Sequence, residues 1–272
     1  MRKLAVWASL VANILLVITG GVVRLTASGL GCPTWPTCTG SSMVPVPAAG
    51  IHGLIENTNR GLTIVLVLVA IFTAWQFWKT AQRWLSVALL AGIPAQAVLG
   101  GISVLTNLNP WVVGGHFVLS AVLIAIATRL VWAFYDKQAA LVSGIDRAIS
   151  IALTIVGSIT VLIGIAVTGA GPHAGDAKSP RNGLDLSVVE HLHSYPAYLT
   201  LVLAVIAFFR LRKEPRLVLI NLGLVATLLF QAAVGVAQAR LGVPALLVGY
   251  HLAGAAILCS LIWAQLFSTK RK

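Results

Sequence analysis

Charged residues are scarce in this chain of 272 residues: Asp, Glu, Lys and Arg make up only 10%, whereas apolar residues make up 58%. A water-soluble domain needs a larger charged share to solvate its surface, so this composition excludes an ordinary soluble protein. Acidic residues are especially few, with 7 Asp and Glu against 19 Lys and Arg. The medium around most of the chain is therefore expected to be lipid.

Long apolar runs indicate the fold class. A bilayer core about 30 Å thick needs roughly 20 apolar residues per helical span, and the sequence contains eight such runs separated by short polar breaks. The first run lacks the small-residue cleavage site of a secretory signal, so we interpret it as a retained helix. The sequence predicts an all-α integral membrane protein whose eight transmembrane helices cover residues 4–25, 57–78, 84–105, 111–133, 148–169, 192–210, 217–238 and 246–268.

The distribution of basic residues predicts the orientation. An even number of spans places both termini on one side, and the positive-inside rule assigns that side to the cytoplasm. Only Arg24, Arg60, Lys178, Arg181 and Arg240 then lie outside or at the outer helix ends. The net charge of +12 is explained by topology and by contact with anionic membrane lipid, and it requires no nucleic acid partner.

Cysteine is also rare, with three residues in all. Cys32 and Cys38 fall in the first outer loop, an oxidising location in which a disulfide persists. Five residues separate them, unlike the two of a thioredoxin motif, so both a structural and a redox-active disulfide remain open. Cys259, deep in the last predicted helix, is interpreted as a small apolar filler.

The second half of the chain repeats the first. The segment Gln96–Gly100 lies twenty residues before His116, and the similar segment Gln231–Gly235 lies twenty residues before His251. Four helices per copy predict two tandem four-helix bundles, related by an axis along the membrane normal. The predicted halves are residues 1–137 and 138–272. Further upstream, Ile55–Asn59 aligns with Val189–His193, and Leu25–Gly29 aligns with Val167–Gly171.

Histidines near the outer ends of the helices are the strongest chemical signal. Ionisable groups inside spans are rare unless they face a bundle interior and find partners. Imidazoles on facing helices at equal depth are able to ligate one haem iron from both sides. His193 and His251 meet this description in the second half; His191 is the alternative to His193, which the repeat register favours.

The first half contains fewer candidate iron ligands. It contains His116, but the counterpart of His193 is Asn59, a poor ligand for iron compared with imidazole. We therefore expect a six-coordinate haem that carries electrons in the second half, and an iron with a weak or open position in the first.

Further polar groups surround the predicted first site. Glu56 and Arg60 are spaced so that they pair on one helix face, either as an interfacial ion pair or with Glu56 in the haem pocket as a proton acceptor or cation stabiliser. Arg24 is a candidate for a haem propionate, although a snorkelling arginine would look the same. His52 is expected to line the mouth of the site.

These residues, taken together, resemble the haem A synthase family. The resemblance rests on the run Gly21–Pro33, the loop Thr168–His173, the paired helix histidines and the four-plus-four repeat. It covers nearly the whole chain.

The resemblance implies oxidation of the C8 methyl of haem O to a formyl group by successive hydroxylation, which yields haem A for cytochrome oxidase. Haem b would be the cofactor at His193 and His251, and the substrate haem would occupy the first half. Glu56 corresponds to the family's glutamate, and Cys32 and Cys38 to its outer-loop pair.

The resemblance also implies a location and partners. The chain would be a multi-pass protein of a bacterial cell membrane with its haem sites toward the outer face. Its partners would be haem O and haem A, membrane lipid, an electron acceptor that the sequence does not identify and, as a candidate, haem O synthase.

Two departures from the family pattern stand out. Many members have Glu-x-x-His-Arg in the second helix, whereas this chain has Glu56-Asn57-Thr58-Asn59-Arg60, so bis-histidine ligation of the substrate is not carried over. Some members have a second cysteine pair between helices five and six, and this chain has none.

Two other functions would make different demands on the sequence. A di-haem cytochrome b that passes electrons between quinone and an outer partner would need two bis-histidine sites, against which Asn59 argues. A transporter built from parallel repeats would need broken helices or charges near the midplane, but the ionisable groups here gather at the outer ends.

Overall fold

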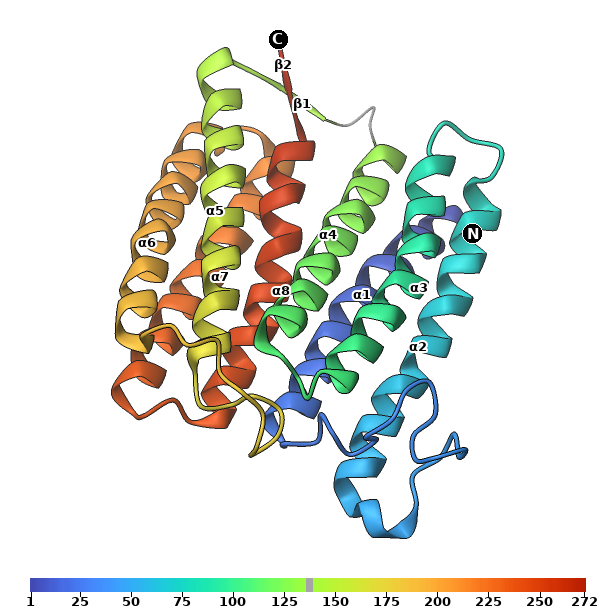
Figure 1. Ribbon diagram of the computed structural model, residues 1–272. Helices are drawn as coiled ribbons and strands as arrows, with labels where there is room; N and C mark the ends of the chain where they lie inside the picture. Colours follow the sequence, from blue (N-terminus) through green and yellow to red (C-terminus); the bar gives the residue numbers. More distant parts are fainter. Residues whose placement is uncertain (136–138) are drawn as a thin grey trace.

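The computed structural model describes residues 1–135 and 139–272, and the chain is almost entirely helical there (Figure 1). Among these residues, eight helices are long and apolar enough to span a membrane, which confirms the predicted helical fold class and number of spans. A short 3-10 turn, Pro47–Ala49, leads into the second of them. The helices are α1 (Arg2–Leu25), α2 (Gly50–Phe77), α3 (Arg83–Leu105), α4 (Pro110–Phe134), α5 (Gly144–Ala170), α6 (Leu186–Leu211), α7 (Pro215–Arg240) and α8 (Ala245–Phe267).

Several helices begin at residues whose side chains suit a helix start. Asn109 accepts a hydrogen bond from the Trp111 amide, and Pro110 follows as the first helical residue of α4, where its missing amide hydrogen costs nothing. Ser143 and Asp185 cap α5 and α6 in the same manner. Each cap satisfies a backbone donor that the helix itself leaves unpaired.

Two predicted helix starts were wrong. Both lie at the end of the molecule where the site residues were expected. Helix α2 begins at Gly50 rather than residue 57, and α6 begins at Leu186 rather than residue 192. Apolar length marks only the part of a helix inside lipid, whereas the backbone stays helical through the polar residues before it. Figure 1 accordingly shows α2 extending past the ends of its neighbours.

The chain also contains a small parallel sheet that the sequence did not predict. Strand β1 (Ala140–Val142) pairs with β2 (Thr269–Arg271) next to the carboxyl terminus. Arg147 supports this pairing by donating to the carbonyl oxygens of Leu266 (2.5 Å) and Thr269 (2.9 Å). Three-residue strands are too short to produce a recognisable alternation of polar and apolar residues.

The helices pack in two rings of four, α1–α4 and α5–α8, and the two rings meet along α8, which we call the seam. Helices α1–α4 each contact their chain neighbours, with α1 also against α4, and α5–α8 do likewise, with α5 against α8. Helix α8 contacts α1 and α4, so Ala256 and Cys259 lie in one buried cluster with Ala5 and Leu130. The predicted boundary at 137/138 falls outside the described residues.

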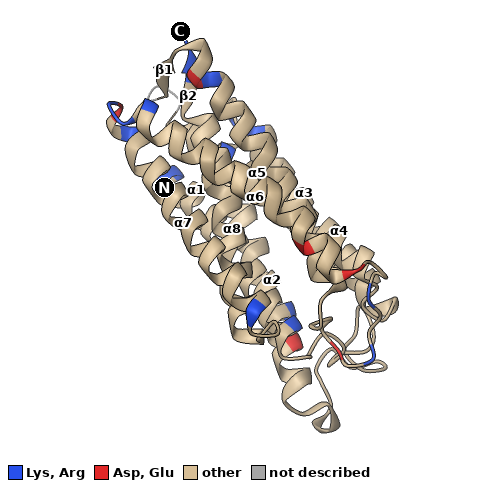
Figure 2. Ribbon diagram, turned by 90° about the vertical axis from the view of Figure 1, so that its left-hand side faces the viewer, with Lys and Arg blue, Asp and Glu red and all other residues tan. Residues whose placement is uncertain are grey.

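The outer surface of the rings is apolar, and the charges lie at the ends. Large apolar side chains such as Leu68, Ile155 and Leu229 stand exposed along the helices, as lipid-facing residues do. Figure 2 shows Lys and Arg gathered at the end that bears the carboxyl terminus, with a few acidic residues among them, and charges of both signs at the opposite end. The long connections 26–46 and 171–185 lie at that opposite end (Figure 1).

Candidate functional site

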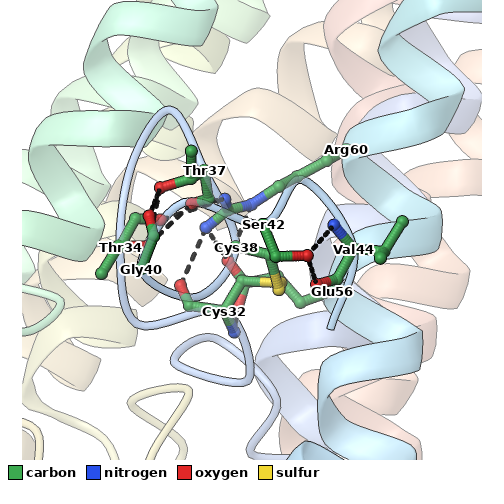
Figure 3. Close-up of a disulfide and its surroundings, with 9 residues drawn as sticks. All are labelled: Cys32, Thr34, Thr37, Cys38, Gly40, Ser42, Val44, Glu56 and Arg60. Carbon is green, nitrogen blue, oxygen red and sulfur yellow. Dashed lines mark hydrogen bonds and ion pairs between the residues drawn. A yellow bond between two sulfur atoms is a disulfide. The ribbon is translucent and has the colours of Figure 1, made fainter. Parts of the chain in front are cut away.

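The first cluster of the site is built on a disulfide. Cys32 and Cys38, both buried, are bonded in the loop between α1 and α2, as Figure 3 shows. The backbone amide of Cys32 donates a 2.7 Å hydrogen bond to Oε2 of Glu56, on the extended first turns of α2. Gly31 precedes the disulfide, and a Cβ there would lie 2.3 Å from the carbonyl oxygen of His52. Only glycine therefore lets the loop lie this close to α2.

Arg60 joins Glu56 to the same loop. Its Nη2 lies 2.5 Å from Oε1 of Glu56, whose side chain is only 7% exposed. The remaining guanidinium hydrogens are directed at the carbonyl oxygens of Cys32 (2.9 Å), Thr34 (3.1 Å) and Thr37 (3.2 Å). The pair is therefore more than an ion pair at the membrane surface, because it fixes the disulfide loop to α2.

The disulfide loop also reaches α3. A Cβ at Gly101 would lie 2.4 Å from the indole of Trp35, so the indole lies directly on this glycine. The preceding residue, Gly100, faces His116 on α4, since a Cβ there would lie 3.3 Å from Cε1 of that imidazole. Gly101 contacts the disulfide loop and the adjacent Gly100 contacts His116, so one short segment of α3 touches both the Glu56 cluster and His116.

His116 has one polar neighbour on α3. One end of the Gln96 amide lies 2.9 Å from Nδ1 of His116, and the other end lies 2.6 Å from the hydroxyl of Ser120. With Nδ1 against the amide, Nε2 is the nitrogen left for a ligand.

His193 and His251 form the second centre, on α6 and α8. Their ring centroids are 6.2 Å apart. Nδ1 of His193 is 3.0 Å from the carbonyl oxygen of Thr160 on α5, which fixes the ring and leaves Nε2 available. Nδ1 of His251 is buried and has no hydrogen-bond partner among the described residues.

This second centre fits an iron held between two imidazoles. Metal–imidazole bonds are about 2.0 Å long, and a ring nitrogen lies about 1.1 Å from its ring centre, so bis-imidazole ligation places the two centroids roughly 6 Å apart. The 6.2 Å separation agrees with that requirement. No group of three or more His, Cys, Asp or Glu in the described part of the chain could hold a bare metal ion, whereas a porphyrin iron needs only one or two protein ligands.

The other predicted site residues lie in different surroundings. His191 is exposed and bonds the Ser187 carbonyl of its own helix, and His52 is exposed with Nδ1 at 3.0 Å from the Ser28 hydroxyl. Oδ1 of Asn59 is buried, with no hydrogen-bond partner within residues 1–135 and 139–272.

Arg24 holds the last turn of α5 and the long loop that follows it. It donates to the carbonyl oxygens of His173 (2.5 Å) and Thr168 (2.7 Å). The structure therefore gives Arg24 a loop-fastening role that the sequence did not predict.

Sequence reasoning missed several residues of the site. Gln96 and Gly100 were recognised only as markers of the repeat, although both lie against the imidazole of His116. Their four-residue spacing, which places them on one helix face, was the available signal. Trp35 and Gly164, which contact Gly101 and His193 across the helices, carry no local signal.

Comparison with known proteins gives concordant results. Residues 3–263 match the model of the COX15-CtaA family, described as a cytochrome oxidase assembly protein. The haem A synthase of Staphylococcus epidermidis is 25% identical over 230 residues, which cover 76% of this chain and 75% of that protein. The haem A synthases of Geobacillus thermodenitrificans and Bacillus cereus strain AH187 are 27% identical over 132 residues and 28% identical over 145 residues. These two alignments cover 46% and 50% of this chain and only 40% and 46% of those relatives.

Proposed function

This chain belongs to the COX15-CtaA family of cytochrome oxidase assembly proteins, and from that premise we propose that it is a haem A synthase. Its reaction is the oxidation of the C8 methyl of haem O to a formyl group by successive hydroxylation. The observation that carries the proposal is the pair of imidazoles at bis-ligation spacing, His193 and His251, in a chain whose relatives are named haem A synthases. The comparisons do not favour the di-haem cytochrome b.

The proposed architecture is two tandem four-helix halves, residues 1–137 and 138–272, related by an axis along the membrane normal. The matching surroundings of His116 and His251 support it. Each imidazole lies against a glycine of the preceding helix, Gly100 or Gly235, with Cε1 3.3 or 3.4 Å from the position that a Cβ would take.

Haem b is the proposed cofactor of the second half, and His193 and His251 are the residues that would hold its iron. The hydrogen bond from Nδ1 of His193 to the Thr160 carbonyl supports this assignment, because iron-ligating histidines commonly donate their other ring hydrogen to such an acceptor. The exposure of His191 and its bond to its own helix support His193 as the ligand.

Substrate haem O is proposed to bind in the first half, with Nε2 of His116 toward its iron. Asn59 is the side chain assigned to the second face of that site, where its unpartnered Oδ1 is available for a hydrogen bond. Arg24 is assigned to a haem propionate and His52 to the mouth of the site. Bound haem supplies the redox-active iron of both sites, and haem O supplies the methyl group.

Glu56 is the proposed proton acceptor or cation stabiliser beside the substrate. The Cys32 amide and Arg60 hold its carboxylate in one position, so the acceptor does not need to be reoriented during the reaction. Arg60 adds a fixed positive charge next to it.

The proposed location is a bacterial cell membrane, with both termini in the cytoplasm and the haem sites toward the outer face. The disulfide supports an oxidising side for the loop 26–46, and the basic end of the molecule (Figure 2) supports a cytoplasmic side opposite to it. The proposed partners are haem O and its product, membrane lipid and, for its supply of substrate, haem O synthase.

Expression in a host that makes haem O but no haem A tests this proposal. The expected result is haem A in the extract upon chromatography, together with haem b bound to the purified protein. A His116→Ala variant is the matched control and should retain haem b without product. Haem b alone in the wild-type protein and no haem A in the host would refute the assignment.

A further inference from the structure

Each of the three helix histidines meets its neighbouring helix through a glycine and a polar group one turn earlier. For His193 the glycine is Gly164, whose added Cβ would lie 2.9 Å from Cε1. The polar group is the carbonyl oxygen of Thr160, 3.0 Å from Nδ1. This acceptor belongs to the backbone, so its position is fixed.

For His116 the polar group is a side chain. Gln96 precedes Gly100 by one turn, and one end of its amide lies 2.9 Å from Nδ1 of His116. The other end of the amide lies 2.6 Å from the Ser120 hydroxyl, which both donates and accepts hydrogen bonds. With Nδ1 free of hydrogen, the neighbouring groups favour the amide nitrogen toward the imidazole and the amide oxygen toward Ser120. The opposite orientation, with the oxygen toward the imidazole, is required once Nδ1 carries a hydrogen.

His251 has the equivalent neighbour, Gln231. Its Nε2 donates to the His251 carbonyl oxygen at 2.9 Å. Oε1 of Gln231 and Nδ1 of His251 are both buried without a partner in the described part of the chain. Gly254 leaves room for the amide, since a Cβ there would lie 2.6 Å from Oε1.

The two unpartnered atoms are complementary when iron is present. A neutral imidazole carries one hydrogen, so a histidine that binds iron through Nε2 carries it on Nδ1. That hydrogen needs an acceptor, and a good acceptor makes the imidazole a more basic ligand. A glutamine oxygen fits this requirement, because it is uncharged and adds no ion to the membrane interior.

We propose that Gln96 and Gln231 are positioning residues whose amide oxygens accept the Nδ1 hydrogens of His116 and His251 when iron binds Nε2. Each glutamine thereby sets the reduction potential of the haem on its own side. The inference rests on the proposed function, which names these histidines as ligands.

The experiment uses the full-length protein purified from a host that makes haem O, with a spectroelectrochemical titration of both haems. Gln96→Glu places a stronger acceptor at nearly unchanged volume. The equilibrium ratio of ferric to ferrous haem at His116 should therefore rise about tenfold. For a one-electron couple this lowers the potential by about 59 mV. Gln96→Met removes the acceptor and should raise that potential, with a lower iron–imidazole stretching frequency in resonance Raman spectra.

The repeat supplies the matched control. Gln231→Glu should lower the potential of the haem at His193 and His251 and leave the other haem unchanged, and Gln96→Glu should do the reverse. Unchanged potentials in haem-loaded Gln96→Glu and Gln231→Glu would overturn the inference while the proposed function stands. Equal shifts in both haems from either variant would overturn it too, whereas wild-type protein without bound haem would overturn the proposed function itself.

Discussion

Substituting Gly164 with alanine should weaken haem b binding in the second half. The added Cβ would lie 2.9 Å from Cε1 of His193 and 3.3 Å from its Nδ1. Carbon atoms pack at about 3.5–4.0 Å, so the ring must withdraw by roughly 0.6 Å. The bond from Nδ1 to the Thr160 carbonyl, now 3.0 Å, would stretch beyond the length of an ordinary hydrogen bond.

The expected size of the effect follows from the iron geometry. Metal–ligand distances tolerate changes of only about 0.2 Å, so a 0.6 Å displacement cannot be absorbed without moving α6. Loss of the outer partner of a metal-bound histidine typically costs about 10–100-fold in affinity. We therefore expect the haem b affinity of Gly164→Ala to fall within that range.

Gly235→Ala is the matched control. Its Cβ would lie 3.4 Å from Cε1 of His251, which is ordinary contact, and it carries the same general effect of replacing a helical glycine. Haem b per protein, measured as the pyridine haemochrome during a haem titration, distinguishes the variants. Full haem occupancy and an unchanged low-spin spectrum in Gly164→Ala would refute the geometric reasoning.

Three further predictions concern the remaining site residues. Glu56→Gln should keep the fold and the bound haem b but abolish haem A formation, measured by chromatography of extracted haems; product at the wild-type rate would remove Glu56 from the chemistry. His193→Ala should erase the low-spin haem b spectrum whereas His191→Ala should leave it intact, and the opposite pattern would reverse the ligand assignment. Replacing Cys32 and Cys38 with serine should destabilise the loop by about 2 kcal/mol, or roughly 30-fold in local opening, seen as faster hydrogen exchange in the loop; unchanged exchange would show that Arg60 alone holds it.

The helices could be predicted from the sequence because lipid imposes a length and an apolar composition on every span. The same signal fails where a helix leaves the lipid, which is why the starts of α2 and α6 were misplaced. The strands β1 and β2 were missed because three residues are too few to show a polar–apolar alternation, and the contacts of Arg147 with the chain end next to them are tertiary.

The candidate site was also predictable only where a local sequence pattern marks its residues. The repeat singled out His116 and His251, and the i,i+4 spacing of Glu56 and Arg60 predicted their contact, which the structure contains. Contacts between helices were beyond reach, because only tertiary packing brings Trp35 onto Gly101 or directs Arg24 to the loop after α5.

The seam along α8 has a consequence for how the two rings depend on each other. Leu252 fills the space beside Gly21, where a Cβ would lie 2.8 Å from its side chain, and Ala256 and Cys259 complete a cluster whose other members come mostly from the first ring. The first ring does not close its interior without α8, so a polypeptide severed between α4 and β1 should stay together as one particle in detergent. The two proposed haem centres thus belong to one continuous body rather than to separable modules.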